Sequence, residues 1–149
     1  MRKLIILIII VALIVATNSN KKLYTILSKT EYVEIYTNSL ELQNQNNSNP
    51  CGYGYCMIVD GRIAEDTIKS LEDVSAIQFN YQGEYLDLLN ALNAEVIYIN
   101  ELQGITFIVA YTSFITPFIL VDGDRVNIHI AIKDSGEKII GIPVIYGDI

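Results

Sequence analysis

The chain has 149 residues, of which 51% are hydrophobic and 18% are charged, and its 17 acidic residues outnumber its 10 basic residues to give a net charge of −7. This length and composition are typical of one globular domain, and they exclude a disordered chain, a collagen-like repeat and a small cysteine-dense scaffold. The acidic balance argues against a basic surface for a phosphate backbone. With one His, two Cys and no Trp, the chain lacks the residues of most metal sites and histidine-based catalytic sites.

An unbroken apolar run occupies residues 4–16, and it lies between Arg2-Lys3 and a polar stretch. This order of basic, apolar and polar segments is typical of an export signal. The run of 13 residues is shorter than the roughly 20 residues of a membrane-spanning helix. No clean Ala-x-Ala cleavage site follows, so residues 1–19 are interpreted either as a cleaved signal peptide or as an uncleaved N-terminal membrane anchor.

Residues 20–149 are therefore predicted to form a single extracytoplasmic domain. Without residues 1–19 the chain keeps 17 acidic residues against 8 basic residues, so the net charge of the folded portion is −9. Such a surface repels polyanions and favours a basic protein partner or a cation. The sequence predicts no nucleic-acid partner, and it predicts contact with the membrane only through an uncleaved N-terminal segment.

The first predicted strand lies within residues 31–42, where Val33 and Ile35 alternate with Glu34 and Tyr36. Residues 43–50 are polar and uncharged, which predicts a loop. Both cysteines follow in the pattern C-x4-C, as Cys51 and Cys56. Outside the cytosol such a pair can close a small disulfide loop, whereas neighbouring positions of a regular strand hold their sulfur atoms apart, so the sequence leaves both states open.

The remaining elements follow from apolar periodicity. A period of two predicts strands, and apolar residues at i, i+3, i+4 and i+7 predict helices. Asp60 is a candidate N-cap for the first helix, and Pro143 favours an edge position for the last strand. The predicted strands are residues 53–59, 76–81, 95–100, 104–112, 125–133 and 138–146, and the predicted helices are residues 62–73 and 85–93. The strands 95–100 and 104–112 are predicted to form a hairpin through residues 101–104.

These elements predict the α+β class. We expect a mostly antiparallel sheet of about seven strands with two helices on one face, because the alternating strands leave the other sheet face more polar. The polar side of the predicted strand 125–133 carries Asn127 and His129.

No catalytic, cofactor-binding or metal-binding residue is predicted. His129 is the one imidazole of the chain, and the ordinary interpretation is a surface or half-buried histidine. Tyrosines can form aromatic binding platforms, although strands favour tyrosine for packing alone. The candidate contact surface consists of Tyr53, Tyr55, Asn127 and His129. Asp122-Gly123-Asp124 is interpreted as a turn, because the later ligands of a calcium loop are missing.

The C-terminal segment resembles the end of the YwmB-type proteins. Residues 126–132 read Val-Asn-Ile-His-Ile-Ala-Ile, and residues 140–145 read Ile-Gly-Ile-Pro-Val-Ile. YwmB-type proteins are exported proteins of unknown function from spore-forming bacteria, and their family is labelled TATA-box-binding-like. The resemblance implies a curved antiparallel sheet backed by helices, and it implies a role in the envelope or in sporulation. It transfers no catalytic residue.

Two functions are therefore expected, and a third is argued against. The first is an exported or membrane-anchored, non-catalytic envelope module that acts through contacts with an unidentified envelope protein or ligand. The alternative is an extracytoplasmic hydrolase that uses a pair of carboxylates in a cleft. Nucleic-acid binding, which the family label suggests, requires a basic sheet face and is opposed by the charge of −9.

Overall fold

The computed structural model describes residues 21–38, 48–51, 54–71 and 73–146. A helix over residues 21–27 opens the described chain, and within the described ranges no helix has the length and apolar character that crossing a bilayer requires. The apolar run 4–16 lies outside these ranges. The other elements are β1 (Tyr32–Thr37), β2 (Ser48–Cys51), β3 (Gly54–Asp60), the 3-10 helix η2 (Gly61–Ile63), α2 (Ala64–Ser70), β4 (Val74–Asn80), α3 (Tyr85–Ala91), β5 (Glu95–Leu102), β6 (Ile105–Tyr111), β7 (Ile119–Val121), β8 (Asp124–Val126), β9 (Ile128–Lys133) and β10 (Lys138–Ile142).

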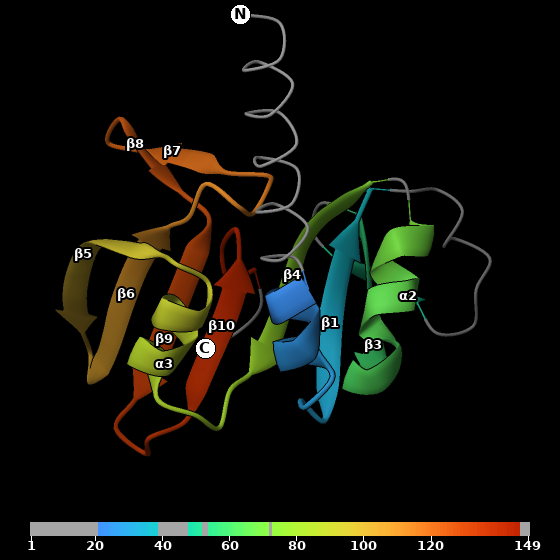
Figure 1. The fold of residues 1–149 in the computed structure, drawn as a ribbon, viewed down its shortest axis with the longest axis horizontal. Coiled ribbons are helices and arrows are strands. Elements are labelled where there is room, and N and C mark those ends of the chain that lie inside the picture. The colour runs from blue at the N-terminus through green and yellow to red at the C-terminus, as the bar shows by residue number, and fades with distance from the viewer. Residues whose placement is uncertain (1–20, 39–47, 52–53, 72, 147–149) are drawn as a thin grey trace, which may run out of the picture.

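Eight of these strands form one sheet in the order β2-β3-β1-β4-β10-β9-β6-β5, and β7 pairs with β8 in a separate ribbon. Every strand pair among the described residues is antiparallel. The predicted α+β class with a large antiparallel sheet is therefore confirmed. The sheet has one strand more than expected, and the helix over residues 21–27 adds a third short α-helix (Figure 1).

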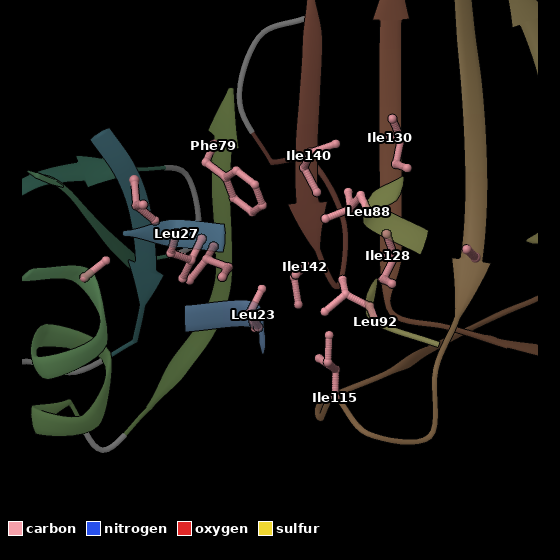
Figure 2. Packing of buried hydrophobic residues seen from close by; sticks show 14 of the residues in the cluster. Leu23, Leu27, Phe79, Leu88, Leu92, Ile115, Ile128, Ile130, Ile140 and Ile142 are labelled. Atoms are coloured by element: carbon pink, nitrogen blue, oxygen red, sulfur yellow. The ribbon is translucent and has the colours of Figure 1, made fainter. Parts of the chain in front are cut away.

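All three α-helices pack on the same face of the sheet, which we call the covered face (Figure 1). Helix α3 forms because Leu88, Leu89 and Leu92 recur at helical spacing and are buried together. Figure 2 shows Leu88 beside Ile140 of β10. One hydrophobic cluster thus joins residues from the helices with strands from both halves of the sheet.

The predicted helix over residues 62–73 is confirmed, with a short 3-10 turn at its beginning. The Asp60 side chain accepts a hydrogen bond from the Arg62 backbone N–H (2.9 Å), so Asp60 is the N-cap of η2. The same carboxylate forms an exposed ion pair with Arg62 (2.5 Å), and these hydrogen bonds lower the pKa of Asp60 to about 2.

The prediction of an edge position for the last strand is wrong. β10 lies in the middle of the sheet, between β4 and β9, and it ends at Ile142, so Pro143 follows the strand instead of interrupting it. The physical reason is that proline lacks a backbone N–H only at its own position. Pro143 lies after Ile142, the last paired residue of β10, so the strand loses no hydrogen bond to its neighbours. β10 and β4 thereby join the two halves of the sheet.

The predicted strand 125–133 is divided at Asn127 into β8 and β9. β8 leaves the sheet to pair with β7, and the two form the hairpin at the upper left of Figure 1. Asp122 and Gly123 have positive φ values of 52° and 94°, which confirms the predicted turn at this position.

Candidate contact surface

The second face of the sheet carries none of the described helices, and we call it the open face (Figure 1). Cross-strand partners share a face, so the register places Tyr98, Val109 and His129 side by side on β5, β6 and β9. The row continues through Gly141 of β10 and Gln78 of β4.

The C-terminal segment after β10 crosses the middle of the open face. A Cβ atom on Gly141 would lie 2.3 Å from the Val144 carbonyl carbon, so only glycine allows the backbone to pass this closely. The Tyr146 backbone N–H donates to the Gln78 side-chain oxygen (3.1 Å), and the Tyr146 ring stacks on Tyr36 with centroids 5.4 Å apart. These contacts occupy the part of the open face over β1, β4 and β10.

Aromatic side chains gather on the other part of the open face, over β5, β6 and β9. The rings of Phe107 and His129 lie 5.6 Å apart. Beyond the end of β6, the ring of Tyr111 contacts Phe118 edge to face at 6.3 Å, and the Arg125 guanidinium lies 4.8 Å from the Phe118 centroid. Tyr98 is 40% exposed and Phe118 is 41% exposed. We call this group the aromatic patch: Tyr98, Phe107, Tyr111, Phe118 and His129.

His129 lies half-buried within the aromatic patch. Burial lowers its pKa from the ordinary value of 6.5, because a desolvated imidazole disfavours the charged form. The imidazole is therefore neutral at pH 7 and offers an apolar ring face with one donor and one acceptor. A neutral ring with these groups is suited to contact with a binding partner.

Strand β5 forms one edge of the sheet, and its residues are exposed along most of its length. A two-residue turn at Gln103 and Gly104, with φ values of 54° and 78°, connects β5 to β6 and confirms the predicted hairpin. In a two-residue hairpin turn, the two residues that flank the turn form a hydrogen-bonded pair. Hydrogen-bonded and non-hydrogen-bonded pairs then alternate along the two strands. We infer that Ile99 and Glu101 direct their backbone N–H groups away from β6, and the Glu101 N–H donates to the Asn100 side-chain oxygen (2.9 Å). The exposed large apolar residues of β5 are Val96, Tyr98, Ile99 and Leu102.

The opposite edge of the sheet is built differently. β2 has four residues, includes Pro50 and replaces the last part of the predicted loop 43–50. The structure places Cys51 and Cys56 as a disulfide between β2 and β3, with Cα atoms 5.8 Å apart. A short strand, a proline and a cross-link are features that prevent further strand pairing. β5 has none of these three, although its register with β6 shifts at a bulge between Val96 and Tyr98.

The described residues of the predicted contact surface, which are Tyr55, Asn127 and His129, do not lie together. Tyr53 lies outside the described residues. Tyr55 packs against the hydrophobic core on the covered face, opposite the buried Thr37. Asn127 is fully buried, so its interpretation as a surface residue is corrected. Of the three described residues, only His129 lies on the open face.

Asn127 is buried because it satisfies the backbone of the loop that follows β6. Its Oδ1 atom accepts from the Thr112 N–H (2.9 Å), and its Nδ2 atom donates to the carbonyl oxygens of Thr112 and Ile115 (both 2.7 Å). The Thr112 hydroxyl donates to the Leu92 carbonyl (2.9 Å). The same side-chain chemistry that marks Asn127 as a contact residue in sequence is used here inside the molecule.

Sequence reasoning missed β5 and the β7–β8 hairpin as contact elements. In β5, apolar residues occupy both faces at positions 96–99, a pattern typical of a buried strand. Its edge position follows only from the strand order. The described residues contain no group of three or more His, Cys, Asp or Glu side chains that could hold a metal ion. Compared with known proteins, the chain matches no family model, no curated protein and no solved structure.

Proposed function

We propose that this chain is an exported or membrane-anchored, non-catalytic module of the cell envelope, related to the YwmB-type proteins, that binds a protein partner through β5 and the aromatic patch. The observation that carries the proposal is the long, exposed and largely apolar edge that β5 presents. An exposed apolar edge strand is a template for an added strand, and folded proteins normally protect such edges. The aromatic patch beside it supplies large rings that are enriched at protein interfaces.

The charges of β5 indicate which class of protein segment would bind to it. Glu95 and Glu101 lie at the two ends of β5 and enclose its apolar centre. A second copy of β5 would add two more carboxylates along the same strand pair, and this like charge disfavours self-pairing. The complementary partner is an extended apolar segment flanked by Lys or Arg.

The open face is also acidic, which argues against nucleic acid as the partner. By register, the charged strand residues on this face are Glu34, Asp60, Glu95 and Lys133. Lys133 is paired with Glu137 (2.8 Å). A nucleic-acid backbone requires several free cations.

Site-specific photocrosslinking in intact cells tests the proposal. A photoreactive residue replaces Ile99, which is 57% exposed on β5, and in a matched control it replaces Ile58, which is 58% exposed on β3. We expect position 99 to crosslink to one envelope protein through a segment flanked by basic residues, and position 58 to give no such product.

A second substitution tests whether strand addition is the mode of binding. Glu101→Pro removes an outward backbone N–H that donates to the Asn100 side chain in the free protein and that an added strand would take over, so we expect it to abolish the crosslink from position 99. Glu101→Lys is expected to weaken binding of the purified partner at least about tenfold. Circular dichroism of both variants checks the fold. An unchanged crosslink in folded Glu101→Pro protein, or the same product from positions 58 and 99, would refute the proposal.

A further inference from the structure

The β7–β8 hairpin exposes large apolar side chains at one end of the sheet. Leu120 is 66% exposed, which is the highest value among the large hydrophobic residues in the described part of the chain, and Phe118 is 41% exposed. A two-stranded hairpin has no core of its own, and it is marginally stable in water unless it packs on another element. Exposed apolar residues on such a hairpin indicate contact with a second apolar surface.

The register of the hairpin separates its side chains into two faces. Leu120 lies opposite Arg125, and Ile119 lies opposite Val126, which is 1% exposed. Cross-strand partners share a face, so Ile119 and Val126 lie on the side that turns toward the body of the protein, and Leu120 and Arg125 lie on the other side. The Arg125 guanidinium lies 4.8 Å from the Phe118 ring centroid, so Phe118 is on the same side as Arg125. We call this side the outer face of the hairpin: Phe118, Leu120 and Arg125.

The outer face of the hairpin carries one charge, and this charge is positive. The acidic residues of the hairpin are Asp122 and Asp124. Asp122 lies in the turn, and Asp124 is paired with Val121 on the same side as Ile119. Although the whole chain has a net charge of −7, the outer face therefore presents two apolar side chains and one guanidinium. This combination suits a boundary between an apolar phase and anionic groups.

The hairpin begins beside the first turn of the helix over residues 21–27. A cavity of about 250 Å³ is lined by Leu23 and Tyr24 of this helix, by Ile115 and Pro117 of the loop that leads into β7, and by Ile142 at the end of β10. The helix therefore starts at the end of the sheet where β10 ends, and the hairpin lies at this same end (Figure 1).

The chain before this helix locates the same end of the molecule relative to a membrane. Residues 4–16 are the predicted anchor, and the five peptide units between Ala16 and Lys21 span at most about 18 Å. In the anchored form of the protein, the first turn of the helix therefore lies close to the lipid surface. Lys21 and Lys22 are both exposed in this turn, so they add two cations to Arg125 at this end of the sheet.

We propose that the outer face of the hairpin binds the headgroup region of an anionic phospholipid bilayer. Phe118 and Leu120 enter the boundary between headgroups and acyl chains, and Arg125 binds lipid phosphates, as residues of interfacial segments do. The sequence predicts membrane contact only through residues 1–19, so the hairpin adds a second, folded contact. This inference rests on the membrane-anchored form in the proposed function. Phe118 also belongs to the aromatic patch, but Leu120 and Arg125 lie outside it and outside β5, so the lipid contact and the protein contact can be tested separately.

Tryptophan fluorescence tests the lipid contact, because the chain contains no Trp. The full-length Leu120→Trp variant is reconstituted in vesicles of phosphatidylcholine and phosphatidylglycerol, with and without bromine near the top of the acyl chains. We expect the brominated lipids to reduce the emission from position 120 at least about twofold, because interfacial side chains reach the upper acyl chains. In the matched control, Ile58→Trp, the replaced residue is 58% exposed on β3, and we expect no quenching. Circular dichroism checks the fold of each variant.

Charge reversal tests the role of Arg125. In the Leu120→Trp background, Arg125→Glu is expected to lower the quenching in vesicles that contain phosphatidylglycerol, and this effect should shrink in vesicles of phosphatidylcholine alone. Lys29→Glu, which reverses an exposed lysine beyond the other end of the same helix, is the control and should leave the quenching unchanged.

The outcomes separate the lipid contact from the proposed protein contact. Absence of quenching at position 120 in a chain that stays in the vesicles, equal quenching at positions 58 and 120, or the same loss from Arg125→Glu and Lys29→Glu would overturn the lipid contact. A protein crosslink from position 120 in place of quenching would assign the outer face to a protein partner and overturn it too. A chain that alkaline carbonate releases from the vesicles would overturn the anchored form as well. Loss of the envelope crosslink from position 99 with preserved quenching at position 120 would refute only the proposed protein contact.

Discussion

At the scale of single residues, Asn127 shows how one polar side chain supports a loop. Its three hydrogen bonds, all 2.7–2.9 Å, hold Thr112 and Ile115 where the chain leaves β6 for the β7–β8 hairpin. Within the described ranges, no buried side-chain nitrogen or oxygen atom lacks a partner. Asn127 can satisfy several buried backbone groups because its side chain supplies both an acceptor and donors.

Asn127→Ala is expected to lower the free energy of unfolding by about 2–4 kcal/mol, because it leaves a backbone N–H and two carbonyl groups buried without these partners. Urea denaturation followed by circular dichroism measures the change. Asn90→Ala, which alters an exposed asparagine of α3, is the control and should cost much less. A similar loss in the two variants would contradict the role assigned to Asn127.

His129 gives a pH dependence whose sign follows from its environment. Burial lowers its pKa in the folded state below 6.5, so the unfolded chain binds a proton first as the pH falls. The free energy of unfolding should therefore decline as the pH decreases through about 6.5. His129→Gln should remove this part of the decline, as measured by urea denaturation between pH 7.5 and 5.5. An identical pH profile in the variant would show that another group is responsible.

At the scale of elements, the two edges of the sheet differ in ways that matter for binding. β2 is short and linked to β3, whereas β5 has eight residues and is largely exposed. In Figure 1, β5 and the β7–β8 hairpin lie on the same side of the molecule, away from α2. One edge is therefore short and cross-linked, and the other is long and exposed, which is the basis of the proposed strand addition at β5.

The disulfide between Cys51 and Cys56 stays a prediction for the protein in its cellular compartment. Mass spectrometry of the exported protein without reductant should show a chain that lacks the mass of two hydrogens. The Cys51→Ser/Cys56→Ser variant should lose up to about 2 kcal/mol of unfolding free energy, since the cross-link closes only a short loop. Free thiols that react fully with an alkylating reagent before reduction would refute it.

At the scale of the whole molecule, β4 and β10 join two half-sheets over one hydrophobic cluster. Leu27 packs in this cluster with Phe79 of β4, and Leu88 packs in it with Ile140 of β10 (Figure 2). Because both halves share this core, we expect the described region to unfold as one cooperative unit.

The cellular location is also a property of the whole molecule, and it determines which partners the protein meets. We predict that fractionation places the protein outside the cytoplasm or on the outer side of the membrane, because residues 2–20 have the order of an export signal. Mass spectrometry of the N-terminus distinguishes a cleaved signal from an anchor. Intact Met1 in the soluble cytosolic fraction would defeat the prediction and, with it, the envelope role.

Local patterns in the sequence predicted the fold class, both helices and the β5–β6 hairpin, because periodicity and turn chemistry depend on residues that are close in the sequence. The central place of β10, the separate β7–β8 ribbon and the burial of Asn127 depended on contacts between distant segments. The location of the candidate contact surface also depended on contacts between distant segments. Alternation identified His129 as a residue of the more polar face, but strand order alone placed it near Tyr98 and left β5 at an edge. A sequence determines which side chains can be buried, whereas only the tertiary structure decides which backbone edges and side chains remain accessible.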